Sequence, residues 1–103
     1  MVVLVDDQTL SSAELITLAL QDHGVARVVG EPTAGGLTVP RYVPLGDGYV
    51  LMTPERMALG PATGRIPEGR RVHPDVLVRN RSPEDFASGK DPQLDRAMEL
   101  LTQ

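Results

Sequence analysis

The first thirty residues pass from one hydrophobic period to another. A β-branched apolar run at 2–5 ends in a polar turn, and apolar residues then recur at helical spacing. The continuous run is typical of a buried strand, and the later spacing is typical of an amphipathic helix. We therefore predict a strand at 2–5 and a helix of about three turns that opens at Ser11-Ser12-Ala13-Glu14 and has His23 in its last turn. Its predicted inner side consists of Leu15, Ile16, Leu18, Ala19 and, at the margin, Leu20.

A second apolar run follows the helix closely. Gly24 is a plausible C′ residue, so the helix is expected to end just before it. Residues 26–30 then form a second short strand. Strand, helix and strand within about 30 residues favour a right-handed βαβ unit with parallel strands. The loop at 31–36 contains two glycines.

Two extended runs in the middle of the chain indicate a hairpin. Residues 39–45 and 49–53 are joined by Gly46-Asp47-Gly48, which predicts a hairpin with a bulge. The prolines at 40 and 44 restrict the first strand to an edge or to irregular pairing. Residues 54–75 are rich in proline and glycine, and we expect an ordered loop there.

The last quarter contains three short elements. Residues 76–78 suit a short strand, and Ser82-Pro83-Glu84-Asp85 suits the capped start of a brief helical turn. The final helix is expected to begin with Asp91 at its N-cap and Pro92 at N1. The apolar face predicted for it consists of Leu94, Ala97, Met98 and Leu101.

Composition narrows the range of functions. The 103 residues carry a net charge of −4 and only three aromatic side chains, which argues against a nucleic-acid binder. No cysteine is present, so disulfides and thiolate metal sites are excluded. No apolar run approaches the roughly 20 residues of a membrane span. Because a buried-type strand begins directly after Met1, we expect this chain to be part of a longer polypeptide with further strands upstream.

Ser11 permits two interpretations. A serine at a strand-to-helix turn lies beside free backbone N–H groups and the positive helix end, which suits a nucleophile whose reaction builds an oxyanion. The spacing Ser11-x-x-Glu14 also fits a capping box, which is much commoner than a catalytic serine. Spacing alone leaves both interpretations open.

Three motifs resemble peptidase family S41, which includes carboxyl-terminal processing proteases, tricorn-type proteases and retinoid-binding modules. TLSSAELITLALQDHGVARVVGEPTAGG is similar to the T-A-S-A-S-E block with its following Q-D and V-G-E-P-T. PLGDGYVL is similar to P-L-x-D-G, and PEGRRVHPDVLV to x-E-G-x-G-V-x-P-D. The resemblance implies an α/β fold, a layered ClpP/crotonase-like core, with residues 1–103 as the C-terminal part of a catalytic domain whose upstream part is absent. The implied function is that of a serine endopeptidase acting on polypeptides.

Carried over residue by residue, the resemblance makes Ser11 the nucleophile and the Ser12 amide an oxyanion donor. Glu68 matches a glutamate that orients the catalytic group, and no cofactor or metal is implied. Gly36 stands where the processing branch has its general-base lysine, and the only lysine is Lys90, in a polar turn. The T-A-G-G form resembles the tricorn and retinoid-binding branch, in which an upstream histidine acts as base. We therefore expect the isolated chain to be inactive.

The remaining polar residues have simpler interpretations. His23 lies about 18 Å from Ser11 along the helix, and its position suits the helix end. His73 is interpreted as a solvated loop residue, and Asp6 and Asp7 as turn formers. A basic stretch is interpreted as a solvated face rather than as a clamp for a substrate carboxylate. Its members are Arg65, Arg70, Arg71, Arg79 and Arg81.

A second function remains open, that of a non-catalytic ligand- or peptide-binding module on the same fold. An upstream histidine able to reach Ser11 would favour the enzyme. Uncovered strand edges and apolar faces lead us to expect a homo-oligomer of this chain. The resemblance favours the bacterial cell envelope, where most relatives are found, and leaves the cytoplasm open, because the tricorn type is cytosolic.

Overall fold

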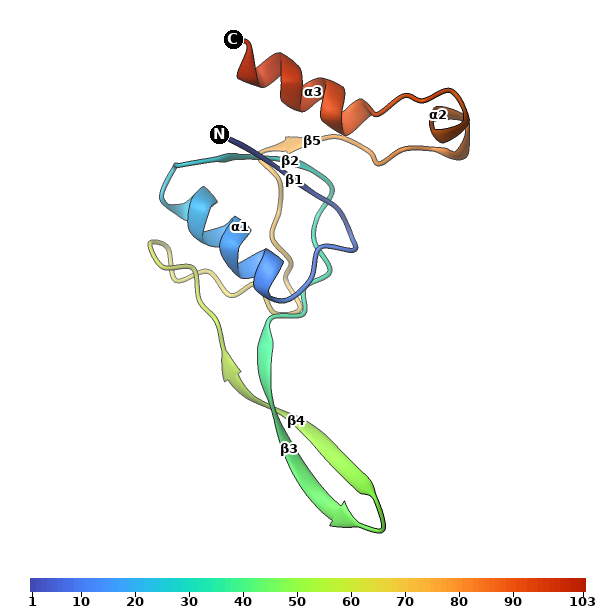
Figure 1. The fold of residues 1–103 in the computed structure, drawn as a ribbon. Coiled ribbons are helices and arrows are strands. Elements are labelled where there is room, and N and C mark those ends of the chain that lie inside the picture. Colours follow the sequence, from blue (N-terminus) through green and yellow to red (C-terminus); the bar gives the residue numbers. More distant parts are fainter.

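A computed structural model describes all residues from 1 to 103, which form a body and a projecting hairpin (Figure 1). The body contains a three-stranded sheet with α1 on one side and α3 on the other (Figure 1). Elements follow in the order β1 (Val2–Val5), α1 (Ser12–Asp22), β2 (Arg27–Gly30), β3 (Thr38–Gly46), β4 (Tyr49–Met57), β5 (Val76–Leu77), α2 (Pro83–Ala87) and α3 (Pro92–Leu101). The fold is therefore mixed α/β.

The sheet has the order β1-β2-β5, and both pairs are parallel. Val3 is opposite Val28, and Val29 is opposite Val76. Strand, helix and parallel strand within the first thirty residues confirm that part of the prediction. The core is centred on β2, whose Val28 and Val29 are fully buried. Both α1, with buried Leu18, and α3, with buried Ala97, contact this strand.

Gly30 lets the ends of β1 and β2 approach each other closely. Its φ of 135° is one that side-chain-bearing residues rarely adopt, and a Cβ at this position would lie 1.8 Å from the Val5 carbonyl oxygen. Just beyond it, the Glu31 N–H donates to the same oxygen at 3.0 Å. The loops that leave these two strands therefore start side by side.

The predicted end of α1 is confirmed. Gly24 has φ 65°, and its N–H donates to the Gln21 carbonyl at 2.9 Å. The Val25 N–H donates to the Leu20 carbonyl, also at 2.9 Å. This pair of bonds is the Schellman arrangement, with glycine at C′. His23 is the C-cap residue, one position beyond the helix.

The faces predicted for two helices are partly wrong. On α1 the buried side chains are Glu14, Thr17 and Leu18, while Leu15 and Ile16 are exposed. Because apolar residues surround most of this helix, its hydrophobic pattern did not single out one face, and contact with β2 and the 65–72 segment selects it. On α3 the buried residues are Gln93 and Ala97. The exposed ones are Leu94, Met98 and Leu101.

A hydrogen bond explains the orientation of α3. The Gln93 amide donates to the Val78 carbonyl at 3.1 Å, and this bond fixes the polar residue against the chain that leaves β5. The predicted caps are confirmed, because Asp91 accepts from the Leu94 N–H at 3.0 Å and Pro92 begins the helix. No helix has both the length and the apolar composition needed to cross a membrane.

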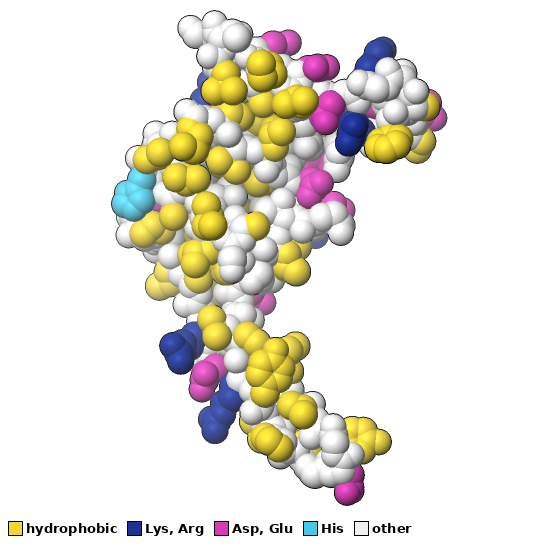
Figure 2. All heavy atoms as spheres, in the orientation of Figure 1, with side chains coloured by type: hydrophobic (Ala, Val, Ile, Leu, Met, Phe, Trp, Pro, Cys, Tyr) yellow, Lys and Arg dark blue, Asp and Glu magenta, His cyan; other side chains and the backbone are white.

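The hairpin of β3 and β4 is longer than predicted and extends away from the body (Figure 1). Residues 54–57 pair within β4, so their assignment to a loop was wrong. The turn consists of Asp47 and Gly48, both with positive φ, and the register shifts beside it as the predicted bulge requires. Figure 2 shows hydrophobic side chains along this arm, where Tyr42 is 63% and Tyr49 is 74% exposed.

Candidate active site

Two loops meet at the edge of the sheet where β1 and β2 end, because parallel strands bring their carboxyl ends together. The Asp6 side chain closes a turn by accepting from the Gln8 N–H at 3.0 Å, which confirms its predicted role. Thr9 then joins the two loops, since its carbonyl accepts from the Ala34 N–H at 2.9 Å. The loop after β1 delivers Ser11 to this junction.

Ser11 has an unusual backbone conformation. It is the N-cap residue of α1, with φ 59° and ψ −122°, and it is exposed. A capping serine normally has extended φ and ψ, and a strained conformation of this kind costs about 1–3 kcal/mol. The Ser11 hydroxyl makes no capping hydrogen bond, because the Glu14 N–H donates to the Ser11 carbonyl at 2.9 Å, and only the Glu14 carboxylate makes its half of a capping box. The hydroxyl is therefore held at a helix N-terminus without being used to cap it.

The backbone N–H groups around Ser11 differ in their use. The Ser11 N–H donates to Glu14 Oε2 at 3.0 Å, and the Ala13 N–H reaches the Leu10 carbonyl at 3.3 Å. The Ser12 N–H donates to no other group in the chain. An available amide beside a serine hydroxyl, at the positive end of a helix, is the arrangement that stabilises an oxyanion.

Glu14 joins the serine turn to the loop after β2. Its carboxylate is fully buried and accepts from the Ser11 N–H, the Thr33 hydroxyl at 2.5 Å, the Gly35 N–H at 2.8 Å and the Gly36 N–H at 2.9 Å. Burial alone would raise the pKa of this carboxyl, but the four hydrogen bonds outweigh burial and lower the pKa below its ordinary value. An ionised carboxylate therefore fixes the backbone on both sides of the junction.

The sequence pattern identified Glu14 only as a capping partner. Its additional partners lie 19 to 22 residues further along the chain, so no local spacing indicates them. The one available signal was the E-P-T-A-G-G loop, whose threonine and glycines supply three of the four donors. Thr33 also accepts from the Val72 N–H at 2.8 Å, which connects the third motif to the first.

Glu68 lies beside the same loop but does not contact Ser11. Its Oε2 accepts from the Leu37 N–H at 2.5 Å, and the neighbouring Gly69 N–H donates to the Gly35 carbonyl at 2.9 Å. Glu68 is half-buried. The structure thus brings the first and third motifs together, and the second lies at the tip of the projecting hairpin. Glu68 is separated from the serine by the loop at 31–36.

Neither a lysine nor a histidine of this chain is hydrogen-bonded to Ser11. A Cβ at Gly36 would lie 2.6 Å from Leu10 Cδ1, so a side chain at this position would require the exposed end of Leu10 to move. His23 is exposed at the far end of α1, and the His73 ring is exposed and lies 3.1 Å from the Arg70 carbonyl. No group of three or more histidine, aspartate and glutamate side chains is arranged to hold a metal ion.

A strained serine beside an available amide at a helix N-terminus suits a nucleophile that forms an acyl intermediate. The chain belongs to peptidase family S41, whose family model matches residues 1–78. A protein described as a tricorn protease homologue from Streptomyces coelicolor is 37% identical over 99% of this chain. A carboxy-terminal-processing protease from Bartonella bacilliformis is 29% identical over 82% of it.

Structural comparison agrees with the family assignment. The crystal structure of the tricorn protease superimposes with a TM-score of 0.83 over 97% of this chain at 30% identity. The match covers 10% of that solved chain, and the chain spans 9% of the Streptomyces relative and 19% of the Bartonella relative. The described residues therefore correspond to a small part of each of these proteins.

Proposed function

We propose that Ser11 is the nucleophile of an S41-type serine endopeptidase that acts on polypeptides. In this proposal residues 1–103 are the C-terminal part of its catalytic domain, on a ClpP/crotonase-like core. The observation that carries the proposal is the Ser11 backbone, which is strained and exposed while its hydroxyl makes no capping bond. A serine that only caps a helix needs no strained backbone, whereas strained backbone is common at catalytic residues.

The reaction follows from the groups around Ser11. The Ser11 hydroxyl oxygen attacks the scissile carbonyl, its proton passes to a general base, and the Ser12 N–H donates to the developing oxyanion. The peptide amine then leaves with a proton, and water releases the acyl group from Ser11. The positive end of α1 stabilises the same negative charge.

The general base comes from residues outside this chain, and an upstream histidine is the candidate that the family resemblance supplies. The glycine at position 36 supports this proposal, as do the exposed positions of His23 and His73. Glu68 acts as the orienting acid in this scheme, beside the loop that Glu14 holds. The isolated chain, lacking a base, should then be inactive, so casein hydrolysis by residues 1–103 that Ser11→Ala abolishes would refute this assignment.

A serine-directed phosphonofluoridate tests the nucleophile in the protein as its gene encodes it. We expect one adduct, mapped by mass spectrometry to Ser11, in the parent protein and in a Ser12→Ala variant. Ser11→Ala should remove the adduct. Labelling of Ser12 in place of Ser11, or labelling that survives Ser11→Ala, would contradict the proposal.

One observation favours a second function, that of a non-catalytic peptide-binding module. Ser11 has no hydrogen-bonded histidine or lysine within the chain. If the encoded protein also lacks a base, it should bind polypeptides without cleaving them and should resist the phosphonofluoridate. Turnover together with Ser11 labelling excludes this alternative.

We also propose that the isolated chain associates with a second copy of itself. The outer edge of β1 has no partner strand, and the hairpin exposes apolar side chains such as Tyr42, Leu45 and Met52. Uncovered edges and apolar surfaces of this kind favour association. Light scattering at micromolar concentration should give a mass of at least twice 11.1 kDa. A clean monomer would show that the fold does not require these surfaces to be covered.

A further inference from the structure

The turn at 6–9, which leads from β1 toward the serine, is closed by hydrogen bonds between its two ends. The Thr9 N–H donates to the Asp6 carbonyl at 3.0 Å, and the Asp6 N–H donates to Thr9 Oγ1 at 3.1 Å. Asp6 Oδ1 also accepts from the Gln8 N–H at 3.0 Å. Asp6 therefore binds within the turn through its N–H, its carbonyl and its carboxylate, which restricts the conformations that the turn can adopt.

The second carboxylate oxygen of Asp6 binds a segment that is distant in sequence. Asn80 Nδ2 donates to Asp6 Oδ2 at 2.9 Å, although 74 positions separate the two residues. The Asn80 amide is oriented by another bond, in which its Oδ1 accepts from the Arg81 N–H at 2.7 Å. No other hydrogen bond joins the turn at 6–9 to the chain that follows β5. The Asp6–Asn80 bond is therefore the one polar connection between these two segments.

The same turn helps the loop at 31–36 to hold Ser11 from both sides. Before the serine, the Thr9 carbonyl accepts from the first of three consecutive N–H groups at 34–36, at 2.9 Å. After the serine, the Glu14 carboxylate accepts from the other two. Strained backbone persists only where the surrounding structure fixes it, and these bonds fix the chain on each side of Ser11.

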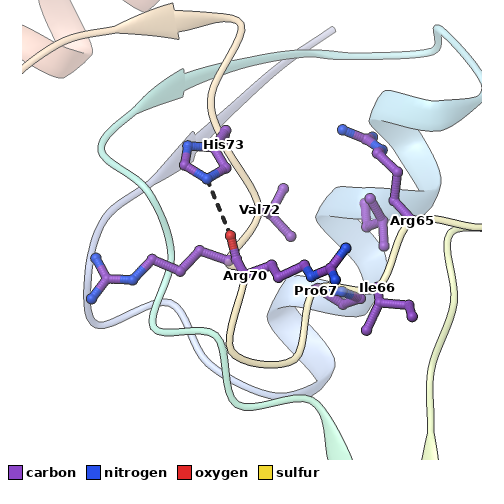
Figure 3. A pocket seen from close by; sticks show the side chains of 8 residues that line it. Arg65, Ile66, Pro67, Arg70, Val72 and His73 are labelled. Carbon is purple, nitrogen blue, oxygen red and sulfur yellow. Dashed lines mark hydrogen bonds between the residues drawn. The ribbon is translucent and has the colours of Figure 1, made fainter.

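The loop at 31–36 is a firm support for these bonds. The Thr33 N–H donates to the Val72 carbonyl at 3.1 Å, and Thr33 is fully buried. Val72 belongs to the segment that runs beside α1 in Figure 3, and it is buried as well. The turn at 6–9 is thus placed between two fixed points, this loop and Asn80.

We propose that Asp6 and Asn80 are positioning residues for Ser11. Neither is hydrogen-bonded to Ser11, and both act through the turn at 6–9 and the Thr9 carbonyl. The proposal deepens the proposed function, because it rests on Ser11 as the nucleophile. Without the Asp6–Asn80 bond the turn can relax, and the strain at Ser11 then displaces the hydroxyl. Small displacements of a reacting group cause large losses of rate.

An exchange of the two side chains tests the bond. Asp6→Asn sets two NH₂ groups against each other, and Asn80→Asp sets two carboxylates against each other, so each single variant loses the bond. The double variant carries the donor at position 6 and the acceptor at position 80, which restores it. Both exchanges keep an oxygen for the neighbouring N–H group, that of Gln8 or Arg81.

The readout is the rate at which Ser11 of the encoded protein reacts with the phosphonofluoridate, measured together with kcat and KM for a quenched peptide. We expect each single variant to react about tenfold more slowly and to lose a similar factor in kcat, with KM unchanged. The double variant should return to within about twofold of the parent, since the two positions are coupled through one bond.

Two controls separate positioning from charge and from stability. Asp7→Asn removes the same charge one residue away, where the carboxylate accepts only from the Gln8 side chain, at 3.3 Å. Ser82→Ala removes a helix cap far from the turn. Both controls should react at the parent rate.

Parent rates in both single variants, or a double variant as slow as the single ones, would overturn the proposal. Slowing in either control as large as that in Asp6→Asn would also overturn it, because charge or stability would then explain the effect. A parent protein that is not labelled at Ser11 would refute the proposed nucleophile and this proposal with it. Ser11 labelling at the parent rate in the single variants would refute this proposal alone.

Discussion

Two helices in this chain begin with the same pattern and use it differently. Ser82-x-x-Asp85 opens α2, where Ser82 is extended at φ −78° and ψ 166° and its hydroxyl accepts from the Asp85 N–H at 3.1 Å. Ser11-x-x-Glu14 opens α1, where Ser11 has φ 59° and its hydroxyl makes no such bond. One serine therefore caps its helix, and the other is held in place for a different use.

The two acidic residues account for much of the difference. Asp85 binds locally, to the Ser82 N–H at 3.0 Å and to Arg79 at 2.5 Å. Glu14 binds the Ser11 N–H but also three donors of a loop on the next strand, and it is fully buried. Because Glu14 binds a distant loop as well as the Ser11 N–H, the position of that loop helps to fix the backbone of Ser11. The comparison teaches that hydrogen-bond partners outside the Ser-x-x-acid pattern determine whether its serine caps the helix.

The largest expected effect is the loss of catalysis when Ser11, but not Ser82, is replaced by alanine. Ser11→Ala in the encoded protein should lower kcat/KM for an internally quenched peptide by about 10⁴ or more, as the loss of a nucleophile does in studied proteases. Ser82→Ala should leave kcat/KM unchanged. Loss of activity in both variants, with both still folded, would mean that helix capping and not nucleophilic attack is being measured.

The second prediction exchanges each acid for its amide. In Glu14→Gln the new NH₂ group faces two of the four donors, which should lower the free energy of unfolding by about 1–3 kcal/mol. The shifted backbone should reduce kcat by about 10²-fold, since small misplacements of reacting groups have effects of this size. Asp85→Asn makes the same exchange at α2 and should leave kcat unchanged. Activity at the parent level in folded Glu14→Gln would show that Glu14 does not position the serine.

A third prediction uses stability alone. Ser82→Ala should lower the free energy of unfolding by about 1 kcal/mol, because it removes a formed cap. Ser11→Gly should raise it by up to about 1 kcal/mol, because glycine adopts positive φ without strain. Chemical denaturation of the two variants beside the parent measures both changes. Destabilisation of similar size in both would show that Ser11 also caps its helix.

The smallest expected effect is on the stability of the protein at low pH. The hydrogen bond from Arg79 lowers the pKa of Asp85 to about 2, and a bond from the Ser82 N–H adds to it. Because the folded pKa lies below the unfolded one, the stabilisation is present above the ordinary value of 3.8 and is lost as the pH falls toward 2. Asp85→Asn should remove this pH dependence, which denaturation at several pH values can measure. Since Arg79 is exposed, salt should weaken the effect, and an unchanged acid profile in the variant would contradict it.

Much of the fold could be predicted because its signals are local. The continuous run of β1, the glycine after α1 and the Asp47-Gly48 turn each act on neighbouring residues. Asp91 and Pro92 likewise mark the start of α3. Local signals of this kind depend on steric preferences and short-range hydrogen bonds, which are largely independent of the rest of the chain.

The site was harder to predict because its contacts are distant in sequence. The spacing of Ser11 and Glu14 indicated a cap, and nothing local revealed the strained serine backbone. The inner face of α1 was misassigned at Leu15 and Ile16, since packing decides which side of a largely apolar helix is buried. The basic stretch was interpreted as a solvated face, whereas three of its five members form ion pairs. Each of these outcomes depends on which segments the fold brings together.

Gly30 has a consequence for engineering this scaffold. No side chain fits there, because even a methyl group would overlap the Val5 carbonyl oxygen. Any replacement must widen the gap between β1 and β2, and the serine turn and the loop that Glu14 binds would separate with it. A mutational library built on this domain can therefore vary residues around the serine but should keep position 30 constant. The lack of a side chain at Gly30 therefore determines how closely the serine turn and the loop that Glu14 binds can approach each other.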